Sequence, residues 1–311
     1  AGYRSVWDEL SFYHVRTSTN DPANAGTGAV TGIQGYHNGA GNTSRRGDAY
    51  RFGLQLDLGA HTQTYVTYSR GYKGPAYNVF FNMLARDEIA LAPETSKSWE
   101  AGIKGSLLSR KITYSLAAYT TDFNNFQANF SDIAAGAIVT RLINAGTARS
   151  RGVEVDLGLR PIAGLSLDTS VAYNDATVLH FNCPPGAANS CNIDGQPLPY
   201  APRWKLYENI AYRFPIAQGW DIELQTDVSL KSATQYQLTQ TPSTIQPSYV
   251  LFNASAALLG QDNGWQLRAF VKNIGNQHYS NLLGNGAVAG TMRFVPRDDL
   301  RYGGILLRKN F

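Results

Sequence analysis

Hydrophobic and polar residues alternate with a period of two along much of the chain. The clearest window runs from Trp220 to Leu230, where the apolar positions are separated by the polar residues Asp221, Glu223, Gln225, Asp227 and Ser229. A period of two places these polar residues on one face of an extended strand and the apolar residues on the other. The alternation recurs at 153–159 and 165–173 and, with one or two lapses each, at 52–58, 99–107, 112–118, 252–258 and 265–271. Helical spacing fits none of these windows, so the pattern predicts amphipathic β-strands.

The connections between the predicted strands alternate in length. Short turns fall at 59–61, 108–110, 161–164, 215–219 and 260–264. The intervening connections, most of them much longer, fall at 17–48, 73–96, 131–137, 180–203, 235–247 and 275–301. Short turns on one rim and long loops on the other are typical of outer-membrane β-barrels.

Between these connections lie about twelve predicted strands, at 2–14, 49–58, 62–72, 97–107, 111–130, 138–160, 165–179, 204–214, 220–234, 248–259, 264–274 and 302–311. Each strand reverses the direction of the one before it, and the last one ends on the short-turn side. The predicted fold is therefore all-β, the wall of a transmembrane antiparallel up-and-down β-barrel.

An amphipathic strand can also belong to a soluble β-sandwich, whose apolar faces share a dry core. The barrel is favoured by the chain length, by the loop asymmetry and by aromatic residues near strand ends, namely Tyr65, Trp99, Trp204, Tyr212, Phe214, Trp220 and Trp265. In a membrane, such residues form belts at the two interfaces. One residue breaks the pattern, because Glu208 falls in the apolar register of Trp204 and Leu206. Either a β-bulge or a position near the outer rim would explain it.

Composition and charge exclude other classes. No run of residues approaches the length of about 18 apolar positions that a transmembrane helix needs. The formal net charge of +4 is spread along the chain, with no basic cluster beyond Arg45-Arg46, so nucleic-acid binding has little support. Residues 1–15 lack the charged start and apolar core of a secretory signal, which for an exported protein predicts a processed or truncated chain.

The chain contains two cysteines, Cys183 and Cys191, in a stretch rich in Pro, Gly and Asn. Their spacing favours a small disulfide-closed loop in an oxidising compartment, with a pair of free thiols as the alternative. Two cysteines are too few for a structural zinc site. The histidines are dispersed, and most fall in or beside predicted connections, so they are interpreted as polar rim residues rather than metal ligands: His14, His37, His61, His180 and His278.

Five short motifs follow one another between residues 69 and 279, and the resemblance that they carry extends over nearly all of the chain from about residue 49 onward. They are Ser69-Arg70-Gly71-Tyr72-Lys73-Gly74; Pro93-Glu94-Thr95 with Trp99-Glu100-Ala101-Gly102-Ile103-Lys104; Asn144-Ala145-Gly146-Thr147-Ala148 with Arg151-Gly152-Val153-Glu154; Gly195-Gln196-Pro197-Leu198-Pro199 with Ala201-Pro202-Arg203-Trp204; and Val271-Lys272-Asn273-Ile274-Gly275-Asn276 with Tyr279. In this order they resemble the C-terminal part of TonB-dependent outer-membrane receptors. The last motif departs from the family, because Gly-Asn stands at its acidic position.

The resemblance implies a barrel of about 22 strands, of which the predicted strands would form the C-terminal half. It also implies an N-terminal plug domain with the short box that engages TonB, and nothing in this sequence resembles either. We therefore predict that residues 1–311 form a partial outer-membrane β-barrel domain, with the plug domain absent from this chain. The final strand resembles the signal that the barrel assembly machinery recognises, with an ordinary amphipathic strand as the alternative; its signal residues would be Tyr302, Ile305, Leu307 and Phe311.

By the same resemblance, the intact protein would lie in the bacterial outer membrane, in contact with the lipid bilayer and lipopolysaccharide. It would bind a scarce solute, a ferric siderophore or similar chelate, and import it with TonB energy through the absent plug domain. An oligosaccharide or cobalamin transporter is one alternative. A passive, closed twelve-stranded pore, in which the first and last strands pair, is the other.

No cofactor, metal site or catalytic residue is predicted. The chain lacks the G-x-S-x-G, H-E-x-x-H and phosphate-loop motifs, so an enzyme is not expected. For solute contacts the sequence favours aromatic residues of the long loops, which could stack on a chelate or sugar or could instead serve in loop packing: Tyr72, Tyr77, Phe80, Phe81 and Tyr236. Four basic residues would attract anionic ferric chelates, namely Arg45, Arg46, Arg86 and Arg297.

Overall fold

The computed structural model describes residues 1–15, 39–79, 83, 85–134, 137–184, 191–260, 264–285, 290–297 and 299–309. Its main element is one antiparallel sheet of twelve strands. In spatial order these are β1 (Gly2–His14), β2 (Gly39–Asp57), β3 (Thr62–Lys73), β4 (Glu94–Leu107), β5 (Ile112–Asn124), β8 (Gly146–Leu159), β9 (Leu165–Phe181), β10 (Trp204–Ala217), β11 (Trp220–Lys231), β14 (Tyr249–Gly260), β15 (Trp265–Lys272) and β18 (Tyr302–Lys309).

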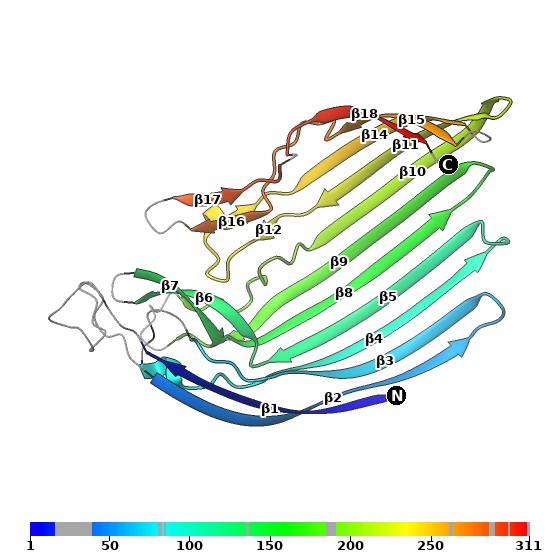
Figure 1. The fold of residues 1–311 in the computed structure, drawn as a ribbon. Helices are drawn as coiled ribbons and strands as arrows, with labels where there is room; N and C mark the ends of the chain where they lie inside the picture. The colour runs from blue at the N-terminus through cyan, green and yellow to red at the C-terminus, as the bar shows by residue number, and fades with distance from the viewer. Residues whose placement is uncertain are drawn as a thin grey trace.

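The order of these strands in space follows the chain, as Figure 1 shows, with short turns at one end of the sheet and long connections at the other. The predicted all-β, up-and-down architecture is therefore confirmed. In their described parts, the long connections contain three small hairpins and two 3₁₀ helices: β6 (Gln127–Ala134) with β7 (Ala137–Asn144), β12 (Thr234–Gln235) with β13 (Ile245–Gln246), β16 (Leu282–Asn285) with β17 (Thr291–Phe294), η2 (Ala85–Glu88) and η4 (Pro242–Thr244). No helix among the described residues has the length and apolar character needed to cross a membrane.

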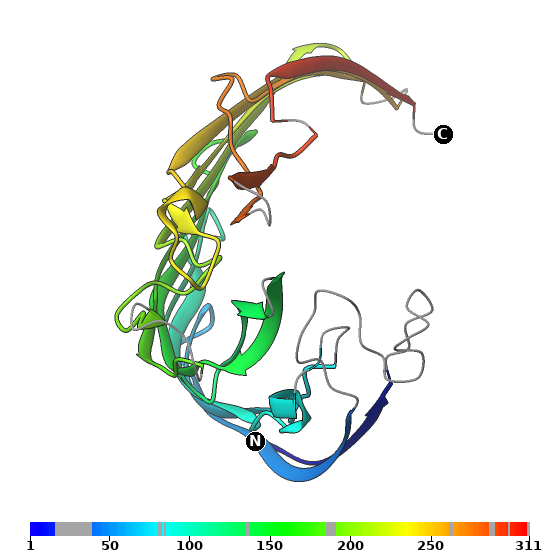
Figure 2. The same cartoon turned by 90° about the vertical axis from the view of Figure 1, so that its left-hand side faces the viewer.

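Two predicted strands, 111–130 and 138–160, are each broken in the structure. The breaks fall at Asn125, with φ +52°, and at Gly146, with φ +110°. Between these two breaks the chain forms the β6–β7 hairpin, which leaves the main sheet and turns toward its concave side (Figure 2). β5 therefore pairs directly with β8. β2 is also longer than predicted, because it pairs with β1 as far as Gly39, opposite His14.

The main sheet curves into an open arc (Figure 2). Within the described residues, β1 pairs only with β2 and β18 only with β15. An unpaired strand edge in lipid leaves backbone N–H and C=O groups without partners, which costs several kcal/mol for each unsatisfied group. A closed twelve-stranded pore would require β1 to pair with β18, and the described parts of these strands do not pair.

The two faces of the sheet differ in chemistry. Large apolar side chains cover the convex face and are widely exposed, as shown by Leu54 and Ile305, each 76% exposed. A soluble sandwich would bury this face against a second sheet, but the described main sheet has a single layer (Figure 2). Aromatic pairs mark both ends of the apolar band, with Tyr173 against Trp204 at 4.8 Å and Tyr212 against Phe214 at 5.0 Å. This face is built for lipid.

Tyr65 is not part of these belts. A Cβ atom on Gly102 would lie 2.6 Å from the Tyr65 ring. Gly102 pairs with Ala117, which in turn pairs with Glu154, in the register that faces the concave side. The Tyr65 ring therefore covers a glycine on the concave face, where the strand-end position alone predicted a belt residue.

Glu208 lies on the convex face inside the apolar band. The register of β10 with both neighbouring strands is unbroken around it, so no bulge explains its position. It stands four residues from Trp204, which for a strand tilted by about 45° places it roughly 9 Å inside the outer aromatic belt. The hydroxyl of Thr169 on β9 donates a hydrogen bond to its carboxylate. Neither a bulge nor a rim position is correct; a hydrogen bond between neighbouring strands accommodates the carboxylate.

Glu208→Leu is expected to leave the barrel as stable as the wild type or more stable by about 1 kcal/mol, whereas Glu208→Lys should destabilise it by about 2–4 kcal/mol. The reason is that a lipid-facing charge is costly and a leucine is not. Urea unfolding of the intact receptor in lipid vesicles measures both. Glu223→Leu is the control, because Glu223 pairs with Arg268 at 2.6 Å on the concave face and its loss should destabilise. A Glu208→Leu variant less stable than Glu223→Leu would contradict the lipid-facing placement.

Candidate functional site

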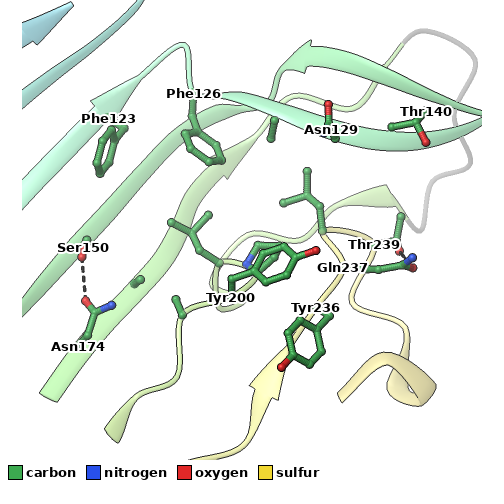
Figure 3. Close-up of a pocket in the computed structure, with 16 residues that line it drawn as sticks. Phe123, Phe126, Asn129, Thr140, Ser150, Asn174, Tyr200, Tyr236, Gln237 and Thr239 are labelled. Atoms are coloured by element: carbon green, nitrogen blue, oxygen red, sulfur yellow. Dashed lines mark hydrogen bonds between the residues drawn. The ribbon is translucent and has the colours of Figure 1, made fainter. Parts of the chain in front are cut away.

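A cavity of about 540 Å³ lies on the concave side of the sheet, at the end with the long connections (Figure 3). Its walls come from the end of β5, the β6–β7 hairpin, β8 and β9, the segment before β10 and the segment after β12. The lining residues are Phe123, Phe126, Ala128, Asn129, Thr140, Ser150, Asn174, Ala176, Leu198, Pro199, Tyr200, Ala201, Tyr236, Gln237, Leu238 and Thr239.

One wall of the cavity, the β6–β7 hairpin, is fixed to the β3–β4 connection by side-chain amides. Asn78 donates to the Leu142 carbonyl and accepts from the Leu142 N–H, both at 2.7 Å. Asn144 makes the same double contact with Ala92, at 2.9 and 2.8 Å. Each amide thus replaces one step of a β-ladder between segments that are far apart in the chain.

A buried ion pair completes this attachment. Arg141 of β7 donates to the carboxylate of Asp87 in η2, and their side chains are only 5% and 2% exposed. Loss of either partner would leave the other as an uncompensated buried charge, which is strongly destabilising. The hairpin is therefore held in place by contacts outside the main sheet.

The facing wall contains two tyrosines in edge-to-face contact, with the ring centroids of Tyr200 and Tyr236 5.2 Å apart (Figure 3). Tyr236 is 4% exposed, and its hydroxyl donates to the carbonyl of Ser280 at 3.1 Å. Burial, and secondarily the neighbouring Tyr200, raise the pKa of Tyr236, so it remains a neutral donor. Tyr200 is 59% exposed and has a left-handed backbone, φ +61°. Tyr236 therefore supports the wall, and the exposed ring of Tyr200 lines the cavity.

None of the described residues lining this cavity carries a charge. Phe123, Phe126 and Tyr200 supply aromatic surface, and amides and hydroxyls supply the polar groups. The hydroxyls of Ser150 and Tyr119 donate to Asn174 Oδ1 at 2.8 and 3.2 Å. Such a lining suits aromatic or weakly polar groups that combine stacking with a few hydrogen bonds.

A small apolar core supports the loops beside the cavity. It consists of Ala145, Val178, Phe181, Ile193 and Leu238, and Cys191 packs against it. Cys191 forms a disulfide with Cys183, with Cα atoms 5.9 Å apart. The bond closes the connection between β9 and β10 where that connection reaches the core.

Of the sequence-predicted solute residues that the structure describes, only Tyr236 lines the cavity. Tyr72 lies over Gly47, where an added Cβ would meet its ring at 2.1 Å, and Tyr77 packs on Phe12 at 4.8 Å. Phe80 and Phe81 lie outside the described residues, as does Phe311 of the predicted assembly signal. The other three predicted signal residues lie in β18. Ile305 and Leu307 are widely exposed on the convex face, and Tyr302 contacts Phe270.

The predicted basic residues are exposed but do not line the cavity. Arg45 and Arg46 lie in β2, Arg86 lies in η2, and Arg297 follows β17. Sequence reasoning missed Tyr200, Phe123 and Phe126. The first of these stands inside the fourth motif, between Pro199 and Ala201, but nothing in the sequence signals the left-handed backbone that exposes its ring.

Ion pairs follow the concave face of the sheet. Arg213 meets Asp221 at 2.6 Å, Arg268 meets Glu223 at 2.6 Å, and Lys272 meets Asp227 at 3.4 Å. Charges of both signs on the face opposite the apolar band are expected of a wet lumen. In the described part of the chain, no group of three or more His, Cys, Asp or Glu side chains could hold a metal ion.

An apolar convex face, a polar concave face and aromatic belts define the wall of an outer-membrane β-barrel. Residues 2–274 match the family model described as TonB dependent receptor-like, beta-barrel. The chain belongs to this family, in agreement with the resemblance of its five motifs, and it is part of an outer-membrane protein.

Solved receptors share the fold. The ferric yersiniabactin uptake receptor FyuA from Yersinia pestis is 18% identical, with a TM-score of 0.70 over 88% of this chain and 38% of that one. The siderophore receptor PiuA from Acinetobacter baumannii is 16% identical, with a TM-score of 0.68 over 98% and 40%. The ferric-catecholate import receptor Fiu from E. coli K12 is also 16% identical, with a TM-score of 0.63 over 98% and 40%. The chain thus spans about two fifths of each.

Proposed function

We propose that this chain forms part of the wall of an energy-coupled receptor that binds a ferric siderophore or similar chelate and imports it with TonB energy. The observation that carries the proposal is the uncharged aromatic cavity at the long-connection end of a TonB-dependent receptor barrel. Aromatic rings and hydrogen-bonding amides suit the organic shell of a chelate. The similar solved structures named above are receptors for ferric siderophores or related chelates, which supports this solute class.

The complete barrel would contain about 22 strands, so that about ten more would pair with the open edges of β1 and β18. A plug domain inside the barrel would engage TonB and respond to its pull. The convex face would contact lipid and lipopolysaccharide. β18 would be the strand read by the barrel assembly machinery, since Ile305 and Leu307 present an apolar row on its convex side.

Tyr200→Ala in the intact receptor is expected to weaken binding of the ferric chelate by about two- to tenfold. The reason is that stacking on an exposed ring contributes about 0.5–1.5 kcal/mol, and 1.4 kcal/mol is a factor of ten. Fluorescence-quenching titration with a panel of ferric siderophores measures the affinity. Tyr77→Ala is the matched control and should bind like the wild type, because Tyr77 packs on Phe12 away from the cavity.

The reverse result, with Tyr77→Ala weakened and Tyr200→Ala unchanged, would move the solute site to the β1–β3 side of the wall. A wild-type receptor that binds no ferric chelate and instead binds an oligosaccharide or cobalamin would overturn the proposed solute class.

A further inference from the structure

Two lysines face each other directly across β10 and β11. Lys205 stands opposite Lys231 in the register of these strands. Side chains alternate between faces, so Lys205 shares the concave face with Arg213, and Lys231 shares it with Asp221. Opposite residues of an antiparallel pair have Cβ atoms about 5 Å apart, and like charges in that position destabilise the sheet.

No carboxylate in the described part of the chain compensates this pair. The other basic residues on the concave face of β10 to β15 each have an acidic partner, as Arg213, Arg268 and Lys272 show at 2.6–3.4 Å. Glu154 lies in the same cross-strand row as Lys205, but Ala172 stands between them. Two strand spacings separate Glu154 from Lys205 by roughly 10 Å, twice the separation of the two lysines.

The lysine pair opens into a second cavity, of about 490 Å³, whose wall also contains Tyr207, Tyr249 and Tyr279. Tyr249 and Tyr279 are stacked, with ring centroids 4.8 Å apart. Glu154 and Asp156 line the far side of this cavity. It therefore has a basic side and an acidic side.

The second cavity borders the first. The Lys231 ammonium lies 5.7 Å from the centre of the Tyr236 ring, and Tyr236 lines the first cavity. Along β9, Ala176 and Asn174 face the first cavity, and Ala172 and Ser170 face the second. The two cavities are thus consecutive along one strand, the uncharged one nearer the long connections.

We propose that Lys205 and Lys231 form a subsite for an anionic group, a carboxylate or a phosphate, of the solute. An anion bound between the two ammonium groups would relieve their repulsion and accept a charge-assisted hydrogen bond from each of them. A solute with an aromatic part in the first cavity would reach this pair with an acidic substituent. The assignment of the anion to a solute rests on the proposed function, whereas anion binding by the lysine pair does not.

The test uses the intact receptor in detergent, with its lysines reductively methylated with ¹³C so that each keeps its charge. Inorganic phosphate is titrated while the methyl signals of Lys205 and Lys231 are followed by NMR, assigned through Lys205→Arg and Lys231→Arg. Both signals are expected to shift with one common dissociation constant. Lys205→Gln should weaken the response of Lys231 at least about tenfold. Lys272 is the internal control and should not respond, because Asp227 already faces it at 3.4 Å.

Signals from the lysine pair that do not move, or that move no more than Lys272, overturn the subsite; this includes the case in which a carboxylate elsewhere in the lumen already neutralises the pair. A second titration compares the double variant Lys205→Gln/Lys231→Gln with the wild type. An anionic ferric chelate should lose about tenfold or more in affinity, and a neutral ferric hydroxamate should bind unchanged. Equal losses for both chelates would reject the solute assignment. If the wild type binds neither chelate, the proposed function fails while the phosphate titration still decides the subsite.

Discussion

Asp87→Ala is expected to release the β6–β7 hairpin from the wall while the twelve-stranded sheet remains folded. The substitution removes the carboxylate that faces the buried guanidinium of Arg141, and breaking a buried ion pair costs about 3–5 kcal/mol. The hairpin is most sensitive to this loss, since among the described strands β6 pairs only with β7, and neither belongs to the main sheet. Opening it displaces Asn129 and Thr140 from the first cavity, so solute affinity should fall as well.

Hydrogen exchange of the intact receptor measures this effect. A loss of 3–5 kcal/mol corresponds to a rise of about a hundredfold to a few thousandfold in the exchange of β6 and β7 amides, with little change in β8 to β11. Asp168→Ala is the matched control, because Asp168 and Arg160 are each 47% exposed and an exposed pair contributes about 0–1 kcal/mol. The double variant Asp87→Leu/Arg141→Leu should recover much of the protection, since it leaves no buried charge. Wild-type exchange of the hairpin in Asp87→Ala would show that the amide contacts alone hold it.

Which face of the sheet each residue of the main strands occupies could be predicted from sequence, because lipid on one side and water on the other favour different residue types at alternate positions. Lipid excludes charge and a wet lumen tolerates it, so the alternation alone assigns Asp221, Glu223 and Asp227 to the concave face. The alternation also placed Glu208 correctly on the lipid side, but it could not show what accommodates the carboxylate there. Glu208 is accommodated on the lipid side by a single hydroxyl, that of Thr169 on the neighbouring strand, and the pairing of two strands cannot be read from one window.

The β6–β7 hairpin escaped prediction for a related reason. The predicted strand 111–130 shows no turn signal stronger than Asn125, and one residue with φ +52° is enough to turn the chain there. What then fixes the hairpin are contacts across long sequence separations, such as those of Asn78 with Leu142. Such pairs have no periodicity. The site was predicted only in part for the same reason, since aromatic composition pointed to Tyr236 but could not separate a ring buried by packing from the exposed ring of Tyr200.

Gly146→Ala is expected to be among the most destabilising single substitutions in the main sheet, with a loss of about 2–6 kcal/mol. Gly146 begins β8 with φ +110°, a conformation that costs a residue with a side chain about 1–3 kcal/mol. An added Cβ would also lie 2.0 Å from the carbonyl oxygen of His180. That oxygen belongs to the backbone of β9, so relief requires the two strands to separate, and overpacking of this kind costs about 1–3 kcal/mol more.

Gly195→Ala separates the two contributions. Gly195 has φ +78°, but a Cβ there would meet nothing within 4 Å, so only the backbone strain of about 1–3 kcal/mol applies. Urea unfolding of the intact receptor in lipid vesicles should therefore rank the wild type above Gly195→Ala, and Gly195→Ala above Gly146→Ala. The Gly146 variant should also lose hydrogen-exchange protection at the β8–β9 end near the disulfide, because Asn182 donates to the carbonyl of Ala145 at 3.0 Å. Equal losses for the two variants would mean that β9 moves to accommodate the added methyl group. The close approach of Gly146 to His180 would then add nothing to the cost of the backbone strain.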